Sequence, residues 1–372
     1  MANNIDLKKE NQNKVYRYIY SSSEPVSKYD LMDSLNLSLP TVNLIIKYLC
    51  ENGYIYDCGT LSSRGGRPPK TYQIVPTLYY SIGLDITGHH IHAVIIDLQG
   101  NIIERTRDKI CFSPSEEYYQ TLAGLVEQML SRSGIDRKHI LGVGIAFPVM
   151  VDMQKQSLLH VELTSVKNVD IEAISRHLGF PCRICNDAKA GGLAESWNVK
   201  DMQNSFYLSL NNTVGGAIFH NRTLYFGETY ESGEVGHMTL VNNGRLCYCG
   251  KNGCVDAYIS ALNLSNSANG SLEQFFQYVE EGSSYHLNIW NEYLESLVIT
   301  VNNLKMLFDC SIIVGGYVGS YLEAYYDTIK EMLIERNTYH ENADYFKICK
   351  FKRFSTAVGA GLINVNEFLK TV

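Results

Sequence analysis

Four side chains that commonly bind zinc fall within a stretch of eighteen residues. His237 is followed by three cysteines, at positions 247, 249 and 254, with glycines between them that let the backbone turn tightly. Zinc takes imidazole nitrogen and thiolate sulfur in a tetrahedral shell, and a closed shell of three cysteines and one histidine is typically structural. The spacing therefore predicts a structural Zn²⁺ site formed by His237, Cys247, Cys249 and Cys254.

Other readings of these cysteines are weaker. A disulfide fits poorly because Cys247 and Cys249 are too close to bridge easily and one cysteine of the three would be left over. A glycine-rich loop whose cysteines are merely small buried side chains stays open as an alternative. The separate pair Cys182 and Cys185 has Cys-x-x-Cys spacing, but on a strand these side chains point to opposite faces, which disfavours a second metal or redox site.

Glu234 stands three residues before His237. A carboxylate and a metal-fixed imidazole at this spacing could accept and donate hydrogen bonds to a ligand rich in hydroxyl groups. The alternative is a surface glutamate beside a metal ligand, and the spacing leaves both open.

Composition indicates a protein of two to three globular domains. The chain has 372 residues, of which 45% are hydrophobic and 19% charged. It contains no apolar run near the ~20 residues that span a bilayer, and its first residues lack the apolar core of a signal peptide, so a cytoplasmic location without a membrane partner is expected. Residues 1–75 carry nine basic and seven acidic side chains, a balance of +2, whereas the whole chain carries −7. Only the N-terminal segment is therefore expected to meet a polyanion such as DNA.

The first 51 residues read as three helices. The first covers 7–20, the second begins after the cap Ser27 and covers 28–34, and the third begins after the cap Ser38. In the third helix the apolar residues between 42 and 49 form one stripe, expected to be buried. The opposite side carries the candidate DNA-reading residues Thr41, Asn43 and Lys47.

Two short strands, 54–57 and 71–74, follow these helices and are joined by a basic loop rich in glycine and proline. This order predicts a winged helix-turn-helix domain over residues 1–76, with Arg64 and Arg67 at the tip of the wing, where they would enter the minor groove of DNA. A three-helix module that binds another protein is the alternative.

Beyond residue 76, strands and helices alternate, which predicts mixed sheets covered by helices. Three strands joined by two turns open this part at 81–106, as an antiparallel edge, and a related pattern returns at 205–220 around a turn at 211–216. Two related α/β halves usually bind a ligand in the cleft between them. The other expected elements are helices at 115–133, 171–178 and 357–369 and strands at 140–147, 181–185 and 311–316.

The chain resembles the ROK family of sugar-responsive repressors and sugar kinases, in its repressor form. The most specific part of the resemblance is the Glu-Val-Gly-His run at 234–237 together with the Cys-x-Cys-Gly-Lys-Asn-Gly-Cys run at 247–254. The resemblance implies an actin-like, hexokinase-type (ribonuclease H-like) ATPase fold of two lobes, assembled as a homodimer or homotetramer. Residues 77–187 plus 356–372 would form the first lobe, and 188–355 the second lobe with the zinc loop.

The resemblance also implies a sugar in the cleft between the lobes. Position 256 is Asp where the family more often has Glu, which would shorten the reach of that carboxylate. The expected partners are this sugar and operator DNA. The sugar-binding residues that the resemblance implies are Asn186, Asp187, Glu234, His237 and Asp256.

Two departures from the family pattern bear on catalysis. Thr87 and His89 replace a glycine and a hydroxyl residue of the kinases' first phosphate loop. In the second phosphate loop, residues 211–213 are Asn-Asn-Thr, whereas family kinases have a run similar to Gly-Thr-Gly. Both changes should crowd a bound phosphate. Asp187, the base position of family kinases, would then only accept a hydrogen bond from the sugar. The expected function is a sugar-responsive regulator, a repressor of carbohydrate-utilisation genes without enzyme activity. The alternatives are an ATP-dependent sugar kinase with an added DNA-binding domain and a non-catalytic scaffold that binds neither DNA nor sugar.

Overall fold

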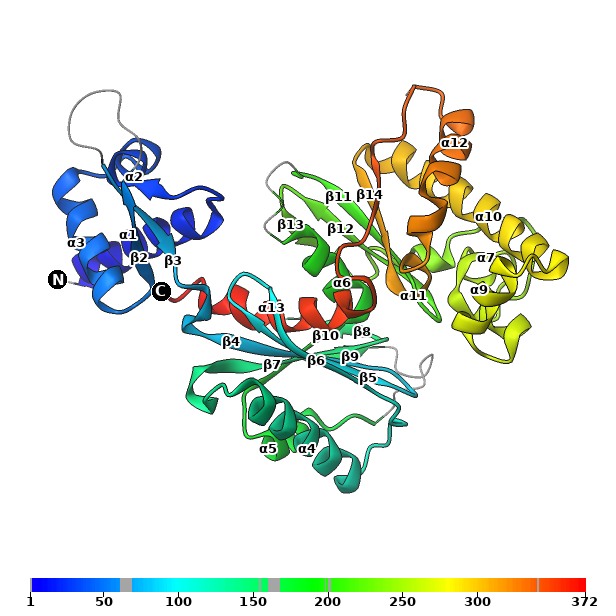
Figure 1. Ribbon diagram of the computed structural model, residues 1–372, viewed down its shortest axis with the longest axis horizontal. Helices are drawn as coiled ribbons and strands as arrows, with labels where there is room; N and C mark the ends of the chain where they lie inside the picture. The colour runs from blue at the N-terminus through cyan, green and yellow to red at the C-terminus, as the bar shows by residue number, and fades with distance from the viewer. Residues whose placement is uncertain are drawn as a thin grey trace.

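Two five-stranded sheets and a small N-terminal sheet organise the chain (Figure 1). The computed structural model describes residues 2–60, 69–153, 155–159, 168–197, 199, 202–339 and 341–372. Within these residues, no helix combines the length and apolar character needed to cross a membrane. Arg64 and Arg67, predicted at the wing tip, lie outside the described residues.

The N-terminal unit combines three helices with an antiparallel sheet of order β1-β3-β2. Both predicted caps are confirmed, since Ser27 and Asp30 form a reciprocal capping box and the Ser38 hydroxyl accepts the Thr41 N–H. The predicted buried stripe of the third helix is also confirmed. The first helix starts earlier than predicted, and β2, predicted at 54–57, starts one residue later and ends three residues later. The elements are α1 (Ala2–Ser21), β1 (Val26–Ser27), α2 (Lys28–Leu35), α3 (Leu39–Glu51), β2 (Ile55–Thr60) and β3 (Lys70–Ile74).

The first large sheet has the strand order β10-β7-β4-β5-β6. Strands β4, β5 and β6 form the predicted antiparallel meander, and β7 and β10 continue the sheet in parallel from β4. Helices α4 and α5 pack on one face, where the apolar side chains of β4, β5 and β7 form a core with them. The elements are β4 (Tyr80–Ile86), β5 (Ile91–Asp97), β6 (Ile102–Asp108), α4 (Glu116–Ser133), β7 (Ile140–Phe147), β8 (Met150–Asp152), β9 (Ser157–Leu159), α5 (Ile171–Leu178) and β10 (Cys182–Asn186).

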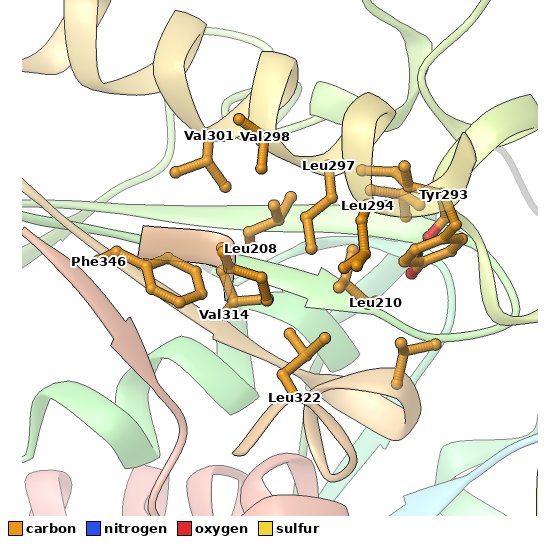
Figure 2. Close-up of a cluster of buried hydrophobic side chains, with 14 of the residues drawn as sticks. Leu208, Leu210, Tyr293, Leu294, Leu297, Val298, Val301, Val314, Leu322 and Phe346 are labelled. Carbon is orange, nitrogen blue, oxygen red and sulfur yellow. Dashed lines mark hydrogen bonds between the residues drawn. The ribbon is translucent and has the colours of Figure 1, made fainter. Parts of the chain in front are cut away.

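The second large sheet repeats this topology in the order β13-β12-β11-β14-β15, which confirms the predicted second copy. Helix α10 covers one face, and Figure 2 shows its residues Leu294, Leu297 and Val301 above Leu208 and Val314 of the sheet. The turn predicted at 211–216 is shorter, because β12 already begins at 214. The elements are β11 (Ser205–Leu210), β12 (Val214–His220), β13 (Thr223–Tyr225), α7 (Asp256–Ile259), α8 (Ala261–Ser265), α9 (Leu272–Glu280), α10 (Ser284–Phe308), β14 (Ser311–Gly315), α11 (Gly316–Gly319), α12 (Tyr326–Arg336) and β15 (Phe346–Ile348).

Helices α6 (Asp187–Ser196) and α13 (Ser355–Phe368) cross each other between the two large sheets (Figure 1). Helix α13 packs on β4 and β7, and α6 packs on β11 and β12. The close approach depends on glycine, because a side chain at Gly144 of β7 would overlap the Ala360 carbonyl of α13. Backbone contact thus fixes the two sheets relative to each other.

The N-terminal unit shares a hydrophobic core with this central region. Its buried residues form one cluster with α13 and with the side chains of β5 that face α13. The Trp197 indole, at the end of α6, donates to the Tyr20 hydroxyl at 2.9 Å, and that hydroxyl donates to the Leu98 carbonyl. The Asn13 amide donates to the Leu369 carbonyl at 2.7 Å. The end of α6 therefore touches the N-terminal unit directly.

The contact between Gly144 and α13 generates a stability prediction. Gly144→Ala should lower the free energy of unfolding by about 3 kcal/mol, because the added methyl group meets backbone that cannot move aside. Thermal unfolding followed by circular dichroism would measure this. Gly124→Ala is the matched control, since Gly124 lies exposed in α4 with open space around it, and this change should stabilise by about 0.5–1 kcal/mol. Equal effects of the two changes would contradict the packing described.

Candidate functional site

A cavity of about 430 Å³ opens between the two large sheets. Its wall combines the segments that follow β7 and β10, the turn between β11 and β12, and the loop after β13. Four of the five residues predicted to bind sugar line this cavity, although they come from stretches far apart in the sequence. They are Asn186, Asp187, Glu234 and His237.

Asn186 and Asp187 stand where β10 ends and α6 begins. The Asn186 side-chain oxygen accepts the Lys189 N–H at 3.0 Å and so caps α6, while its amide nitrogen donates to the Val149 carbonyl at 3.1 Å. One Asp187 carboxylate oxygen accepts the Ala188 N–H at 2.8 Å. Asn186 therefore uses its hydrogen-bonding groups to fix the chain, and Asp187 faces the cavity.

Burial raises the pKa of Asp187 to about 7, and the nearby Asp85 carboxylate adds to the effect. A carboxyl group in this environment is readily protonated, since ionisation deprives it of solvation and places it near a like charge. Asp187 can therefore accept or donate a hydrogen bond at neutral pH.

Lys189 and Glu234 form an ion pair at the wall of this cavity. The Lys189 ammonium lies 3.9 Å from a Glu234 carboxylate oxygen and 3.4 Å from the Tyr230 carbonyl, and the lysine is almost fully buried. Burial raises the pKa of Glu234 and lowers the pKa of Lys189. Sequence reasoning did not identify Lys189, because it did not predict helix α6, whose first turn aims this side chain at the loop that carries Glu234.

The predicted zinc ligands converge on one point. The ligand atoms of His237, Cys247, Cys249 and Cys254 all lie within 4.8 Å of one another. The sulfurs of Cys249 and Cys254 are 3.8 Å apart, and ligand sulfurs around a tetrahedral zinc are separated by about 3.8 Å. The set of three thiols and one imidazole therefore fits zinc.

His237 connects this cluster to the cavity through its two ring nitrogens. Nδ1 lies 4.0 Å from the Cys247 sulfur, and Nε2 lies 3.1 Å from the Tyr248 hydroxyl. A metal ion on Nδ1 would leave the ring proton on Nε2, which would then donate to the Tyr248 hydroxyl. A ligand hydroxyl could take the place of the Tyr248 hydroxyl as the partner of this proton. Tyr248, which sequence reasoning did not single out, also lines the cavity.

Asp256 does not line this cavity, which departs from the role that the family resemblance implied. Its carboxylate accepts the Val214 N–H at 2.6 Å, and the residue is buried at the start of α7. A carboxylate held in this way shapes the turn between β11 and β12. Asp256 therefore contributes to the cavity through the position of that turn.

A second cavity of about 540 Å³ adjoins the first, and Asp187 and Tyr248 belong to the walls of both. It contains the two loops that sequence reasoning compared with phosphate loops. The Thr87 hydroxyl accepts the N–H groups of His89 at 3.4 Å and His90 at 3.0 Å and donates to the His90 carbonyl. In the other loop, the Val214 N–H is held by Asp256. Backbone donors in both loops are therefore occupied by side chains.

Sequence comparison places these features in a known family. The model of the ROK family matches residues 81–366, which is most of the chain. The chain belongs to the ROK family.

The relatives of this ROK protein include regulators. It is 28% identical over 270 residues to a xylose repressor of Bacillus spizizenii. The matched region covers 72% of this chain and 70% of that protein. A xylose repressor of Caldicellulosiruptor bescii is 25% identical over 364 residues, covering 91% and 90%. A solved ROK family transcriptional regulator, described as a homologue of the Escherichia coli MLC protein, superposes with a TM-score of 0.75 at 18% identity over 98% of each chain. Its likeness supports the fold, including the ROK family's actin-like pair of lobes and the N-terminal unit.

The predicted DNA-reading residues of the ROK chain lie on α3. Asn43 and Lys47 are exposed, with Asn43 accepting from the Lys28 ammonium at 2.6 Å and Lys47 lying 3.8 Å from Glu51. Thr41 is half-buried, and its hydroxyl bonds that of Ser38 at the helix start. The same exposed surface carries Leu44 and Tyr48, which the sequence analysis did not include.

The raised pKa of Asp187 predicts a pH-dependent effect of Asp187→Asn. In the folded ROK protein this carboxyl group binds a proton up to about pH 7, whereas in the unfolded chain it ionises near pH 4, so its contribution to stability falls as pH rises between these values. The free energy of unfolding of the variant minus that of the wild type should therefore rise by about 1–2 kcal/mol from about pH 5 to about pH 8. This value is smaller than the full shift in pKa would give, because the side chain faces a cavity.

Urea unfolding at the two pH values would measure this difference. The exposed Asp327→Asn in α12 controls for loss of a surface carboxylate, which should change stability little at either pH. A difference for Asp187→Asn that stays constant with pH, or that shrinks as pH rises, would contradict the environment described for Asp187.

Proposed function

We propose that this protein is a sugar-responsive transcriptional repressor that binds a sugar in the 430 Å³ cavity and operator DNA through its N-terminal unit. The observation that carries the proposal is the convergence of Asp187, Glu234 and His237 on one cavity. Two carboxyl groups and an imidazole held in this way suit a ligand with many hydroxyl groups. The xylose repressors whose similarity extends over up to 91% of the chain support the regulatory role.

We assign residues 1–76 to a winged helix-turn-helix domain. Residues 77–187 plus 356–372 would be the first lobe, and 188–355 the second. In support, the three N-terminal helices are combined with a three-stranded antiparallel sheet whose strands β2 and β3 follow α3, and α13 packs on the first large sheet.

In this proposal α3 lies in the major groove of the operator. Asn43 and Lys47 project outward from it, and Thr41 stands at its N-terminal end, where helix N–H groups also suit a phosphate. Arg64 and Arg67 would contact the minor groove from the wing. Two copies of the chain in a homodimer or homotetramer would bind the two halves of a palindromic operator.

Zinc is proposed as the structural metal of His237, Cys247, Cys249 and Cys254. Bound there, it would cross-link the loop between β13 and α7, which otherwise has little regular structure. It would also fix the ring of His237 toward the sugar.

Helix α6 connects the proposed sugar site to the DNA-binding domain. The first residue of α6, Asp187, faces the cavity. Trp197, directly after the last residue of α6, donates a hydrogen bond to the Tyr20 hydroxyl of α1. A sugar that favours one position of α6 would shift Tyr20 and change how the domain is held. This is a direct mechanical route from effector to operator.

Phosphoryl transfer is not part of the proposal. The Thr87 hydroxyl occupies backbone N–H groups of the first loop, and a phosphate bound there would have to displace it. Asp187 keeps the base position of a kinase but would act as a hydrogen-bond partner of the sugar.

The function predicts that one sugar binds the protein and alters its operator affinity. Operator fragments would be selected from genomic DNA with the full chain, and sugars would be screened by thermal shift, since a ligand of the native state raises the melting temperature. Glu234→Gln should weaken binding of the sugar by about tenfold, because a charged hydrogen-bond acceptor is lost, and should leave operator affinity intact.

Glu228→Gln is the matched control, because Glu228 is exposed and does not line the cavity. Recovery of no enriched DNA fragment would reject the regulator. ATP-dependent phosphorylation of the bound sugar that disappears in Asp187→Asn would favour the alternative, a kinase with an added DNA-binding domain.

The zinc assignment predicts about one zinc ion per purified chain by elemental analysis. Cys249→Ser should lose the metal and weaken sugar binding, because the loop that presents Glu234 and His237 loses its cross-link. Cys58→Ser in β2, outside the cluster, should retain both properties. A metal-free wild-type protein with intact sugar binding would contradict the assignment.

A further inference from the structure

Leu44 lies near the middle of the outward face of α3. At about 100° per residue, position 44 lies almost opposite the buried stripe of this helix, whose members fall between residues 42 and 49. The Leu44 side chain is 68% exposed and belongs to none of the hydrophobic clusters formed by the described residues. A leucine therefore occupies the centre of the face that is proposed to enter the major groove.

Leu44 is part of an apolar ridge along α3, formed by Pro40, Leu44 and Tyr48. The three residues are spaced four apart, so their side chains lie next to one another on one face of the helix. Pro40 is exposed, and Tyr48 is 41% exposed. Single exposed apolar side chains are common on protein surfaces, whereas a continuous apolar row on a face proposed to bind a partner is typical of a contact surface.

The polar side chains beside this ridge are engaged within the N-terminal unit. The Asn43 side-chain oxygen accepts from the Lys28 ammonium at 2.6 Å, and the Thr41 hydroxyl bonds that of Ser38 at 2.9 Å. An asparagine that reads adenine uses its oxygen and its nitrogen together, so the contact with Lys28 competes with such a reading by Asn43. Thr41 is in addition half-buried.

The electrostatic attraction that α3 offers to DNA is small. Its one lysine, Lys47, lies 3.8 Å from Glu51, and these two are the only charged side chains of the helix. Contacts of lysine and arginine with phosphates supply affinity that depends on salt and does not depend on base sequence. The base preference of α3 is therefore expected to depend strongly on apolar contact.

We propose that Leu44 contacts the C5-methyl group of a thymine in each half of the operator and sets the base preference at that position. In the major groove this methyl group distinguishes thymine from the other bases as an apolar contact, whereas the other base edges present hydrogen-bonding groups. Pro40 and Tyr48 would exclude water from the contact. The inference rests on the proposed function, because it requires α3 to lie in the major groove, and it adds the base that the helix reads.

Deoxyuridine tests this contact directly, because it differs from thymidine only in lacking the C5-methyl group. Operator fragments would be selected from genomic DNA with the full chain, and each thymine of their shared sequence would be replaced in turn. At one or more thymines in each half-site, the replacement should weaken wild-type binding about fourfold, since one buried methyl group is lost. Leu44→Ala should weaken operator binding about tenfold and should be insensitive to the same replacement.

Two further variants separate apolar readout from other effects. Leu307→Ala is the matched control, because Leu307 is 67% exposed in α10, outside the N-terminal unit, and this change should leave operator binding unaltered. Lys47→Gln should reduce the salt dependence of operator binding, whereas Leu44→Ala should not, because it removes no charge. Leu44→Ala should also unfold at the wild-type temperature, since an exposed leucine contributes little stability.

Equal operator affinity of the wild type and Leu44→Ala would overturn the contact and leave the proposed regulator intact. A bound operator in which no thymine responds to deoxyuridine would have the same meaning. Recovery of no enriched fragment would reject the regulator and this contact together. A change in the sedimentation of the DNA-free protein caused by Leu44→Ala would assign the ridge to contact between copies of the chain, which also overturns the proposal.

Discussion

The contact of α13 with α6 and with the first large sheet is the constraint on which the rest of the structure depends. Gly144 lets the backbone of α13 approach β7, and Gly359 lets it approach the Ala190 carbonyl of α6. Since both helices lie between the sheets, every cavity-lining residue of one half is placed relative to the other half by these backbone contacts. The C-terminal end of α13 also completes the core of the N-terminal unit. One helix thus joins all three parts of the chain.

Around the first cavity, charge balance is the second constraint. Asp187, Lys189 and Glu234 are held in a small volume, and burial opposes the charged form of each. The single ammonium group pairs with the Glu234 carboxylate, and a ligand that brings hydroxyl groups could hydrogen-bond to the carboxyl groups of Asp187 and Glu234. In the proposed function, such a site would favour neutral, hydroxyl-rich molecules over anions.

Much of this arrangement could be predicted from local sequence signals. The caps at Ser27 and Ser38 and the apolar stripe of α3 are read from spacing alone, and the four zinc ligands lie within one short stretch. Asp256 shows the limit, because the sequence marks it as acidic and near the zinc loop but does not reveal that its carboxylate turns back to the Val214 N–H. Helix α6 was missed for a related reason: it contains two glycines and few polar residues, so it lacks helical periodicity and is stabilised by packing on both sides. Lys189 and its ion pair were missed with it. That Asp85 of β4 lies directly opposite His92 of β5 depends on strand register, which residue types alone do not specify.

Helix α6 spans ten residues, so it is about 15 Å long. A helix of this length bends little, and close contacts at glycine residues hold its sides. It can therefore move only as a rigid unit. In the proposed coupling, a displacement imposed at Asp187 would reach Trp197 with nearly its full amplitude, and the Trp197 indole would pass it to the Tyr20 hydroxyl. Because α6 is short and rigid, a movement of a fraction of an ångström at the cavity would produce a movement of about the same size at α1. The helix would neither reduce nor amplify it.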